Sequence, residues 1–310
     1  MSYCWYPGEP LGDDGPGEAV RSLGLSGVEQ LLYKAESNPV HFPKETVGVH
    51  LMYWPYWMDF WRDDKARLSE IFPDKESLAK RYGGTTREEW LSLIRRNMKT
   101  SLLEEPEYVV WHVAESTDYD AFTYDFHYTN REVLQAAEEV FNAVSDSLPE
   151  TVTVLFENLW WPGLTLLQPE EADYFFSLIK RRNVGIMLDT GHMMNTNPDL
   201  TSEADGARYI CHTVKRLGSL ASLIKGIHLT CSLSGAYQHA FPRVMPDHVD
   251  MARIFQHIIS IDQHRPFQTA AARQIVDFIQ PDYVVHELIG RHLDDPLLEV
   301  RQQMKALRMK

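Results

Sequence analysis

The chain has 310 residues, 44% apolar and 24% charged, with a formal net charge of −14 at pH 7, so it fits one large domain over residues 1–310 better than two average ones. The acidic balance argues against a strong non-specific grip on nucleic acid, because Lys and Arg drive that binding. Cys4, Cys211 and Cys231 are too scattered for a disulfide framework, and no charged-then-apolar leader or membrane-length run occurs, so we expect a soluble cytoplasmic protein with no membrane partner.

Apolar, β-branched runs alternate with helical patterns along the chain, which is typical of repeated βα units around a parallel sheet. We predict eight strands, near residues 2–6, 27–33, 47–53, 108–113, 152–157, 184–189, 225–230 and 282–287. Eight parallel strands predict a closed (β/α)8 TIM barrel of the α/β class.

Helix signals are clearest in the later part of the chain. Thr129 or Asn130 can cap one helix, Pro169 opens another, and the segment DPLLEVRQQMKAL forms the last. Between Tyr33 and Val47 no helix is expected, since prolines interrupt the segment.

Two connections are longer than a barrel needs. The first follows the third strand and runs from Tyr53 to about Thr86 through an aromatic cluster, and the second follows the seventh strand over residues 231–248. Long loops on this face of a barrel usually shape the substrate pocket.

Five of the predicted strands end on residue types that bind metals. They supply His112 in VVWHV, Glu157 in TVLFEN, Asp189 and His192 in GIMLDTGH, His228 in GIHLT, and Glu287 in YVVHEL. Side chains at the carboxyl ends of barrel strands converge on one mouth. Carboxylates with imidazole suit Mn, Mg, Co or Zn. Each residue taken alone could be a strand-end partner in an ion pair, but the succession favours a metal site.

These motifs resemble a known superfamily. LFEN, LDTGH, GIHLT and VVHEL are similar to the metal-binding strand ends of the xylose isomerase-like TIM barrels, which include sugar isomerases and epimerases and the endonuclease IV family. The resemblance runs from about Gly27 to Glu287. It implies that the shared metal ligands are Glu157, Asp189, His228 and Glu287, and that His192 binds substrate or a second metal.

The endonuclease IV branch, whose centre holds three metal ions, is matched further. His50 in VGVHLMY, His112, and the pair Asp262 and His264 complete its ligand set. The resemblance implies a phosphoester hydrolase with up to three divalent ions, zinc being the first candidate. In that scheme Glu157 bridges two ions, His50 and His112 hold an exposed ion, and the Asp262 pair holds the ion nearest the leaving group. The expected catalytic residues are Glu157, Glu287 and His192.

This chain also departs from that branch. Asp262 and His264 lie much farther from His228 than in the branch, so an alternative is that Asp262 caps a turn and His264 covers a helix end. The fourth strand continues as HVAES, where the branch has His followed by Pro and Gly. We therefore expect a small sugar-phosphate or nucleotide-like substrate rather than extended nucleic acid.

A metal-dependent sugar isomerase or epimerase acting on a small polyhydroxy compound is the alternative. The segments ENLWWPG and HLTCSLSGAY lack the second glutamate and the arginine of ketose epimerases, so the general base would be Glu157, Glu287, His239 or His264. A third hypothesis is a barrel that binds a metal or sugar without catalysis.

Substrate contacts are expected from aromatic and loop residues at the mouth. Tyr53 and Trp160 lie nearest the metal-bearing strand ends, and flat rings stack on sugars or bases. His239 is a candidate donor from the loop after the seventh strand. Glu29, in the second strand, is expected to have a structural role, bonding a lysine, or else to bond a ligand.

Overall fold

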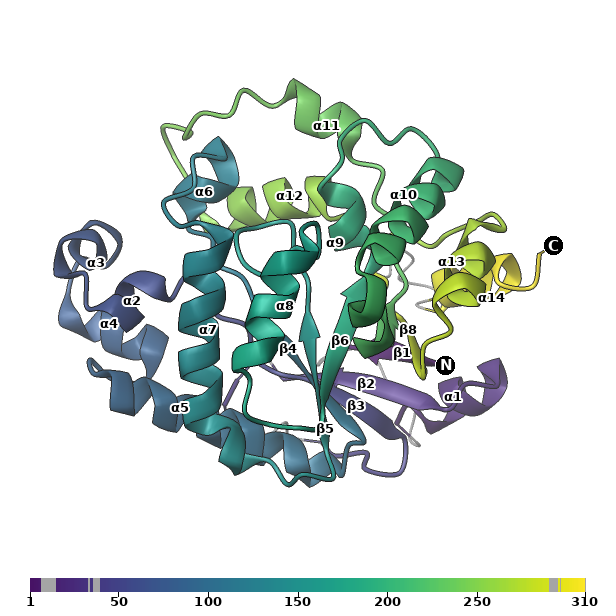
Figure 1. Ribbon diagram of the computed structural model, residues 1–310, viewed down its shortest axis with the longest axis horizontal. Helices are drawn as coiled ribbons and strands as arrows, with labels where there is room; N and C mark the ends of the chain where they lie inside the picture. The colour runs from purple at the N-terminus through teal and green to yellow at the C-terminus, as the bar shows by residue number, and fades with distance from the viewer. Residues whose placement is uncertain (7–14, 33, 36–39, 290–294, 296, 310) are drawn as a thin grey trace.

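The computed structural model describes residues 1–6, 15–32, 34–35, 40–289, 295 and 297–309. Eight parallel strands close into a barrel in chain order, with β1 hydrogen-bonded to both β2 and β8. Helices surround the strands (Figure 1). The predicted (β/α)8 TIM barrel is confirmed.

All eight predicted strands are present. They are β1 Ser2–Trp5, β2 Gly27–Leu31, β3 Thr46–His50, β4 Tyr108–His112, β5 Thr153–Glu157, β6 Val184–Asp189, β7 Ile224–His228 and β8 Tyr283–His286. Several end earlier than predicted, because pairing stops where the chain turns into the loops of the mouth.

The larger helices are α1 Gly17–Leu23, α5 Arg87–Ser101, α7 Asn130–Val144, α8 Pro169–Leu178, α10 Glu203–Arg216, α13 Ala271–Ile279 and α14 Leu298–Ala306. Local sequence sets their starts: Thr129 caps α7 in a capping box with Glu132, and Pro169 occupies the first turn of α8. Short 3-10 turns cover Leu102–Glu104 (η1), Ser145–Ser147 (η2) and Gly218–Leu223 (η3).

Both long connections are present and carry their own helices. The connection after β3 contains α2 Met58–Arg62, α3 Lys65–Ile71 and α4 Lys75–Tyr82, and the one after β7 contains α11 Gly235–Ala240 and α12 Met251–Ile261. The loop after β4 adds α6 Asp118–Thr123, and α9 Thr190–Asn195 follows β6 directly. In the described part of the segment between β2 and β3 no helix forms, as expected.

The main hydrophobic core lies between the strands and the surrounding helices, and a smaller cluster fills the barrel. The interior cluster is made of Cys4, Tyr108, Val110, Leu155, Met187 and Val285. It lies below the polar residues of the mouth, so the barrel is a packed core that presents its chemistry at one end. Among the described residues, no helix is long and apolar enough to span a bilayer.

Candidate metal centre

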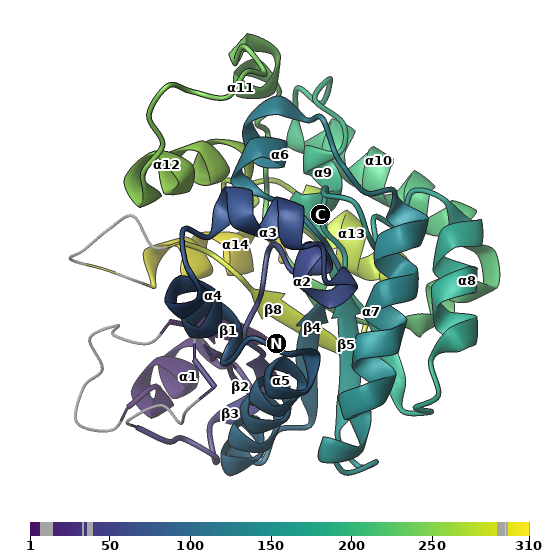
Figure 2. The same ribbon diagram turned by 90° about the vertical axis from the view of Figure 1, so that its left-hand side faces the viewer.

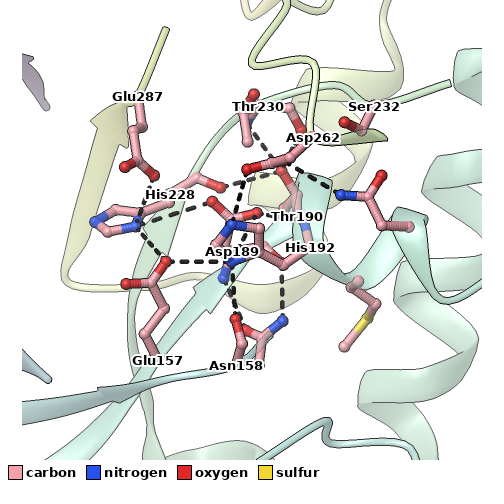
Figure 3. A network of polar contacts seen from close by, with 12 residues as sticks. Glu157, Asn158, Asp189, Thr190, His192, His228, Thr230, Ser232, Asp262 and Glu287 are labelled. Atoms are coloured by element: carbon pink, nitrogen blue, oxygen red, sulfur yellow. Dashed lines mark hydrogen bonds and ion pairs between the residues drawn. The ribbon is translucent and has the colours of Figure 1, made fainter. Parts of the chain in front are cut away.

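Strand geometry explains why polar side chains gather at the mouth. In a strand, residues two apart point to the same face. His112, Glu157 and Asp189 stand two positions after Val110, Leu155 and Met187, which pack inside the barrel. The strand-end residues therefore point inward as well, and Figure 3 shows Glu157, Asp189, His228 and Glu287 turned toward one another.

Glu157 lies at the centre of the group, and each of its carboxylate oxygens faces a different pair of histidines. Its Oε2 is 3.0 Å from Nε2 of His50 and 3.2 Å from Nε2 of His112. Its Oε1 is 3.1 Å from Nδ1 of His228 and 3.4 Å from Nδ1 of His192. One carboxylate thus joins two neighbouring sets of ligand atoms.

A second set surrounds the Nδ1 atom of His228. This atom lies 2.9 Å from Oε2 of Glu287 and 3.9 Å from Oδ2 of Asp189, in addition to Glu157. All three carboxylate residues and the imidazole are buried. Three acidic side chains therefore converge on one nitrogen atom in an interior that excludes water.

A third set forms around Asp262, at the end of α12. Its Oδ2 is 2.6 Å from Nε2 of His264 and 3.2 Å from Nε2 of His192, while its Oδ1 accepts a hydrogen bond from Asn195. The structure therefore brings the Asp262 and His264 pair to the other predicted ligands across the insertion of α11 and α12. Asp262 points into the group, as Figure 3 shows, and not to a turn at the surface.

The ligand atoms fall into compact sets. In the described part of the chain, four sets have ligand atoms that all lie within 4.8 Å of one another: Glu29, His50 and His228; His50, His112 and Glu157; His192, Asp262 and His264; and Glu157, Asp189, His228 and Glu287. All nine ligands predicted from the sequence lie within them.

The hydrogen bonds on the far side of the histidine rings fix which nitrogen carries a proton. Nδ1 of His50 faces the carbonyl of Leu51 at 3.2 Å, Nδ1 of His192 faces that of Asn158 at 2.9 Å, and Nδ1 of His264 faces that of Glu287 at 3.1 Å. A carbonyl only accepts, so each Nδ1 donates its proton. With metal ions bound, the Nε2 atoms of these rings would offer lone pairs to the ions, as metal-binding histidines do.

Burial and close charges shift the ionisation of the cluster strongly. Burial raises the pKa of Asp189 to about 8, with the charge of Glu287 adding to the effect. Burial would lower the pKa of His264, but Asp262 beside it raises that pKa to about 10. Burial lowers the pKa of His112 to about 3. The group therefore holds a dense, mutually dependent set of charges, in which protonated histidines balance the carboxylates.

A divalent cation fits this arrangement. The two carboxylate oxygens of Asp189 differ: Oδ1 accepts a hydrogen bond from the amide of His192, whereas Oδ2 is buried and no donor among the described residues reaches it. An unsatisfied buried carboxylate oxygen is expensive, and a metal ion satisfies it. Carboxylate and imidazole ligands suit zinc, manganese or cobalt. The donor set therefore matches the metals expected from the sequence.

Two residues that support the cluster make contacts that were not predicted from the sequence. Glu29 was expected to bond a lysine or a ligand, but its partners are Nε2 of His228 at 2.9 Å and the hydroxyl of Tyr108 at 2.8 Å. The side-chain amide of Asn158 pairs with both backbone groups of Asp189. The Asn in LFEN, directly after Glu157, was the available signal for this second contact.

The expected substrate contacts divide into two groups. The ring of Tyr53 lies 4.4 Å from that of His112, and the ring of Trp160 lies 5.2 Å from that of His192. Both rings therefore border the cluster. His239 does not: it lies on α11, is 60% exposed and pairs with Asp199. Its position is set by α11, which projects away from the strand ends (Figure 1).

Helices from two loops lie above the carboxyl ends of the strands. Figures 1 and 2 show α6 and α12 together over this end of the barrel. His257 of α12 donates from Nε2 to the carbonyl of Ala121 in α6 at 2.8 Å, and its ring stacks on Phe122 at 4.3 Å. The side chains of His112 and His264 are only 12% exposed, while that of Glu157 is fully buried. The centre is therefore enclosed.

Comparison with known proteins agrees with the superfamily expected from the strand ends. The family model of the xylose isomerase-like TIM barrel matches residues 107–214, which include His112, Glu157, Asp189 and His192. The resemblance to that superfamily is therefore confirmed. No curated protein matches the chain.

Solved structures with the same fold come from several enzyme types. Endonuclease IV from Thermus thermophilus is 14% identical, with a TM-score of 0.52 over 99% of this chain and 98% of that chain. A D-tagatose 3-epimerase-like protein is 13% identical, with a TM-score of 0.50 over 99% and 98%. The 3-keto-D-glucoside 4-epimerase from E. coli is 12% identical, with a TM-score of 0.51 over 99% and 98%. At these identities the likeness establishes the fold alone.

Proposed function

We propose that this protein is a metal-dependent phosphoester hydrolase of the endonuclease IV type, with a centre for up to three divalent ions. The observation that carries the proposal is the contact of Asp262 with both His192 and His264, which adds a third set of ligands to the two joined by Glu157. A one-ion centre would need only the set around His228. A third set is suited to a phosphate, whose oxygens several cations can share.

The residues have distinct roles in this proposal. Glu157 links the set of His50 and His112 to the set of Asp189, His228 and Glu287, and it orients the attacking water. Asp262, His192 and His264 would hold a third ion. Divalent ions held by these residues would neutralise phosphate charge and make a water molecule more acidic.

The enclosure favours a small substrate. Because α6 and α12 contact each other above the strand ends, we infer that the mouth admits a small molecule more readily than a duplex. We therefore propose a sugar phosphate or nucleotide-like substrate, with Tyr53 and Trp160 excluding water from the reacting group.

The set of Glu157, Asp189, His228 and Glu287 also fits a single ion, and this favours the alternative of a sugar isomerase or epimerase. Activity separates the two. The purified chain is assayed with sugar phosphates, nucleotides and short abasic DNA for phosphate-ester cleavage, and with ketoses for epimerisation. Chelator-sensitive ester cleavage supports the proposal. Epimerisation without any ester cleavage would overturn it.

A further inference from the structure

Glu29 is a buried acid below the metal centre, and its two oxygens have different partners. Oε1 lies 2.9 Å from Nε2 of His228, and Oε2 accepts a hydrogen bond of 2.8 Å from the hydroxyl of Tyr108. The side chains of Glu29 and His228 are both fully buried. A carboxylate held inside a barrel at this depth is costly unless its partners compensate for the lost water.

The barrel is built so that Tyr108 can reach Glu29. Glu29 on β2 is paired in register with Gly48 on β3, and Gly48 with Tyr108 on β4. A Cβ atom at position 48 would lie 2.2 Å from Cζ of Tyr108, so only glycine lets the ring cross the intervening strand. The Tyr108 hydroxyl thus fixes the orientation of the Glu29 carboxylate.

His228 is anchored differently from the other histidines of the centre. His50, His192 and His264 each donate to a backbone carbonyl, whereas His228 donates to the carboxylate of Glu29. With a metal ion bound, Nε2 would keep its proton for Glu29, and Nδ1, on the side of Glu157 and Glu287, would offer its lone pair to the ion. A carboxylate partner makes an imidazole a stronger metal ligand than a carbonyl partner does.

We propose that Glu29, held by Tyr108, is a positioning residue that orients His228 and strengthens its bond to the ion shared with Glu157, Asp189 and Glu287. The proposal rests on the metal centre described under the proposed function. Glu29 does not touch the substrate, so its effect is exerted through the affinity of one ion. Of the four ligand sets, that of His50, His112 and Glu157 and that of His192, Asp262 and His264 contain neither Glu29 nor His228.

Metal binding by the full chain tests the inference. The protein is stripped with chelator, and Co²⁺ is added while the absorption spectrum is recorded. Glu29→Gln keeps the shape of the side chain but removes its charge, and we expect the Kd of one ion to rise about 10–100-fold. The remaining ions should bind as in the unmodified chain. Tyr108→Phe should raise the Kd of the same ion by a smaller factor.

A matched control comes from the next residue of β2. Gln30 is also buried, but it bonds Thr46 and Glu104 outside the centre. Gln30→Met should lower the melting temperature of the metal-free chain without changing any Co²⁺ affinity. This control separates loss of a buried polar contact from loss of the anchor of His228.

The outcomes are distinct. An unchanged Co²⁺ affinity in Glu29→Gln overturns the inference, as does an equal loss in Gln30→Met. If Glu29→Gln does not fold, Tyr108→Phe provides the test, because it removes only a hydroxyl. An unchanged Co²⁺ affinity in Tyr108→Phe overturns the inference, and weaker binding of one Co²⁺ ion supports it. If the unmodified chain binds no Co²⁺, the metal centre itself is wrong and the inference fails with it.

Discussion

Asp262 Oδ2 lies 3.2 Å from Nε2 of His192, although the two residues are 70 positions apart in the chain. Two helices, α11 and α12, intervene between β7 and Asp262. The insertion therefore lengthens the connection, while Asp262 and His264 at its end still lie beside His192. This contact separates a three-set centre from the simpler site that the strand ends alone would make.

Replacing Asp262 by Asn tests the third set. Asn has nearly the same shape, but it cannot balance the charge of a cation, so we expect the loss of one ion per chain and a fall in ester cleavage of at least about 100-fold. Metal analysis and steady-state kinetics measure both. Asp199→Asn is the control, since the carboxylate of Asp199 pairs with exposed His239, away from the cluster. Full metal content and normal activity in Asp262→Asn would exclude a role for this residue.

Glu157→Gln should have a broader effect. Because each carboxylate oxygen of Glu157 faces a different histidine pair, the amide weakens two ligand sets together. We expect more than one ion to be lost and turnover to fall by about 1000-fold or more. If turnover persists while the ions are lost, the barrel does not use this centre for catalysis.

The metal-free chain should lose stability as the pH rises. Burial opposes the charge of His264, but Asp262 raises its folded pKa to about 10, from 6.5 in the unfolded chain. Stability from this pair is complete below pH 6.5 and is lost as the pH rises toward 10. Asp189, with its pKa raised by burial to about 8, acts in the same direction. Thermal unfolding from pH 6 to 9 measures the effect.

Acid should also destabilise the metal-free chain. Burial opposes ionisation of Glu157, yet His112 and His228 hold its pKa well below the usual 4.5. Stability from this carboxylate is present above about pH 4.5 and is lost as the pH falls through the lower folded pKa.

Bound metal replaces protons on the histidines, so the melting-temperature gain from added Zn²⁺ should increase between pH 6 and 8. A gain that is constant over this range contradicts histidine ligation.

Gly163→Ala should destabilise the loop beside Glu157. Gly163 has φ +138, and a Cβ there would lie 2.2 Å from the carbonyl oxygen of Val113, so we expect a loss of about 3–4 kcal/mol. Gly24→Ala is the control, because Gly24 has φ +66 but open space around it, and should cost about 1–2 kcal/mol. Chemical denaturation compares them. Equal losses would mean that the contact with Val113 has no effect.

The barrel could be predicted because parallel strands buried on both faces leave short, nearly continuous apolar runs, such as the one ending at Glu157. Period-two alternation then directs His112, Glu157 and Asp189 inward once the barrel closes. Asp262 could be identified as a candidate ligand from its residue type, but its position in space could not be predicted, because it depends on how α12 packs on α6.

The partner of Glu29 could not be predicted. A buried acid on a strand can pair with lysine, arginine or histidine, and only the barrel register places Nε2 of His228 across from it. His239 was a candidate by residue type in a long loop, and the fold of α11 directs it to Asp199. In both cases the deciding contact is made by a residue distant in the sequence.

The most direct test of the metal centre is the number of ions that each chain binds. The chain is purified without chelator, and its metals are counted by elemental analysis against protein concentration. We expect close to three divalent ions per chain, with zinc among them, and fewer in Asp262→Asn. A single ion in the unmodified chain, unchanged in Asp262→Asn, would contradict the three-set centre and favour the isomerase alternative.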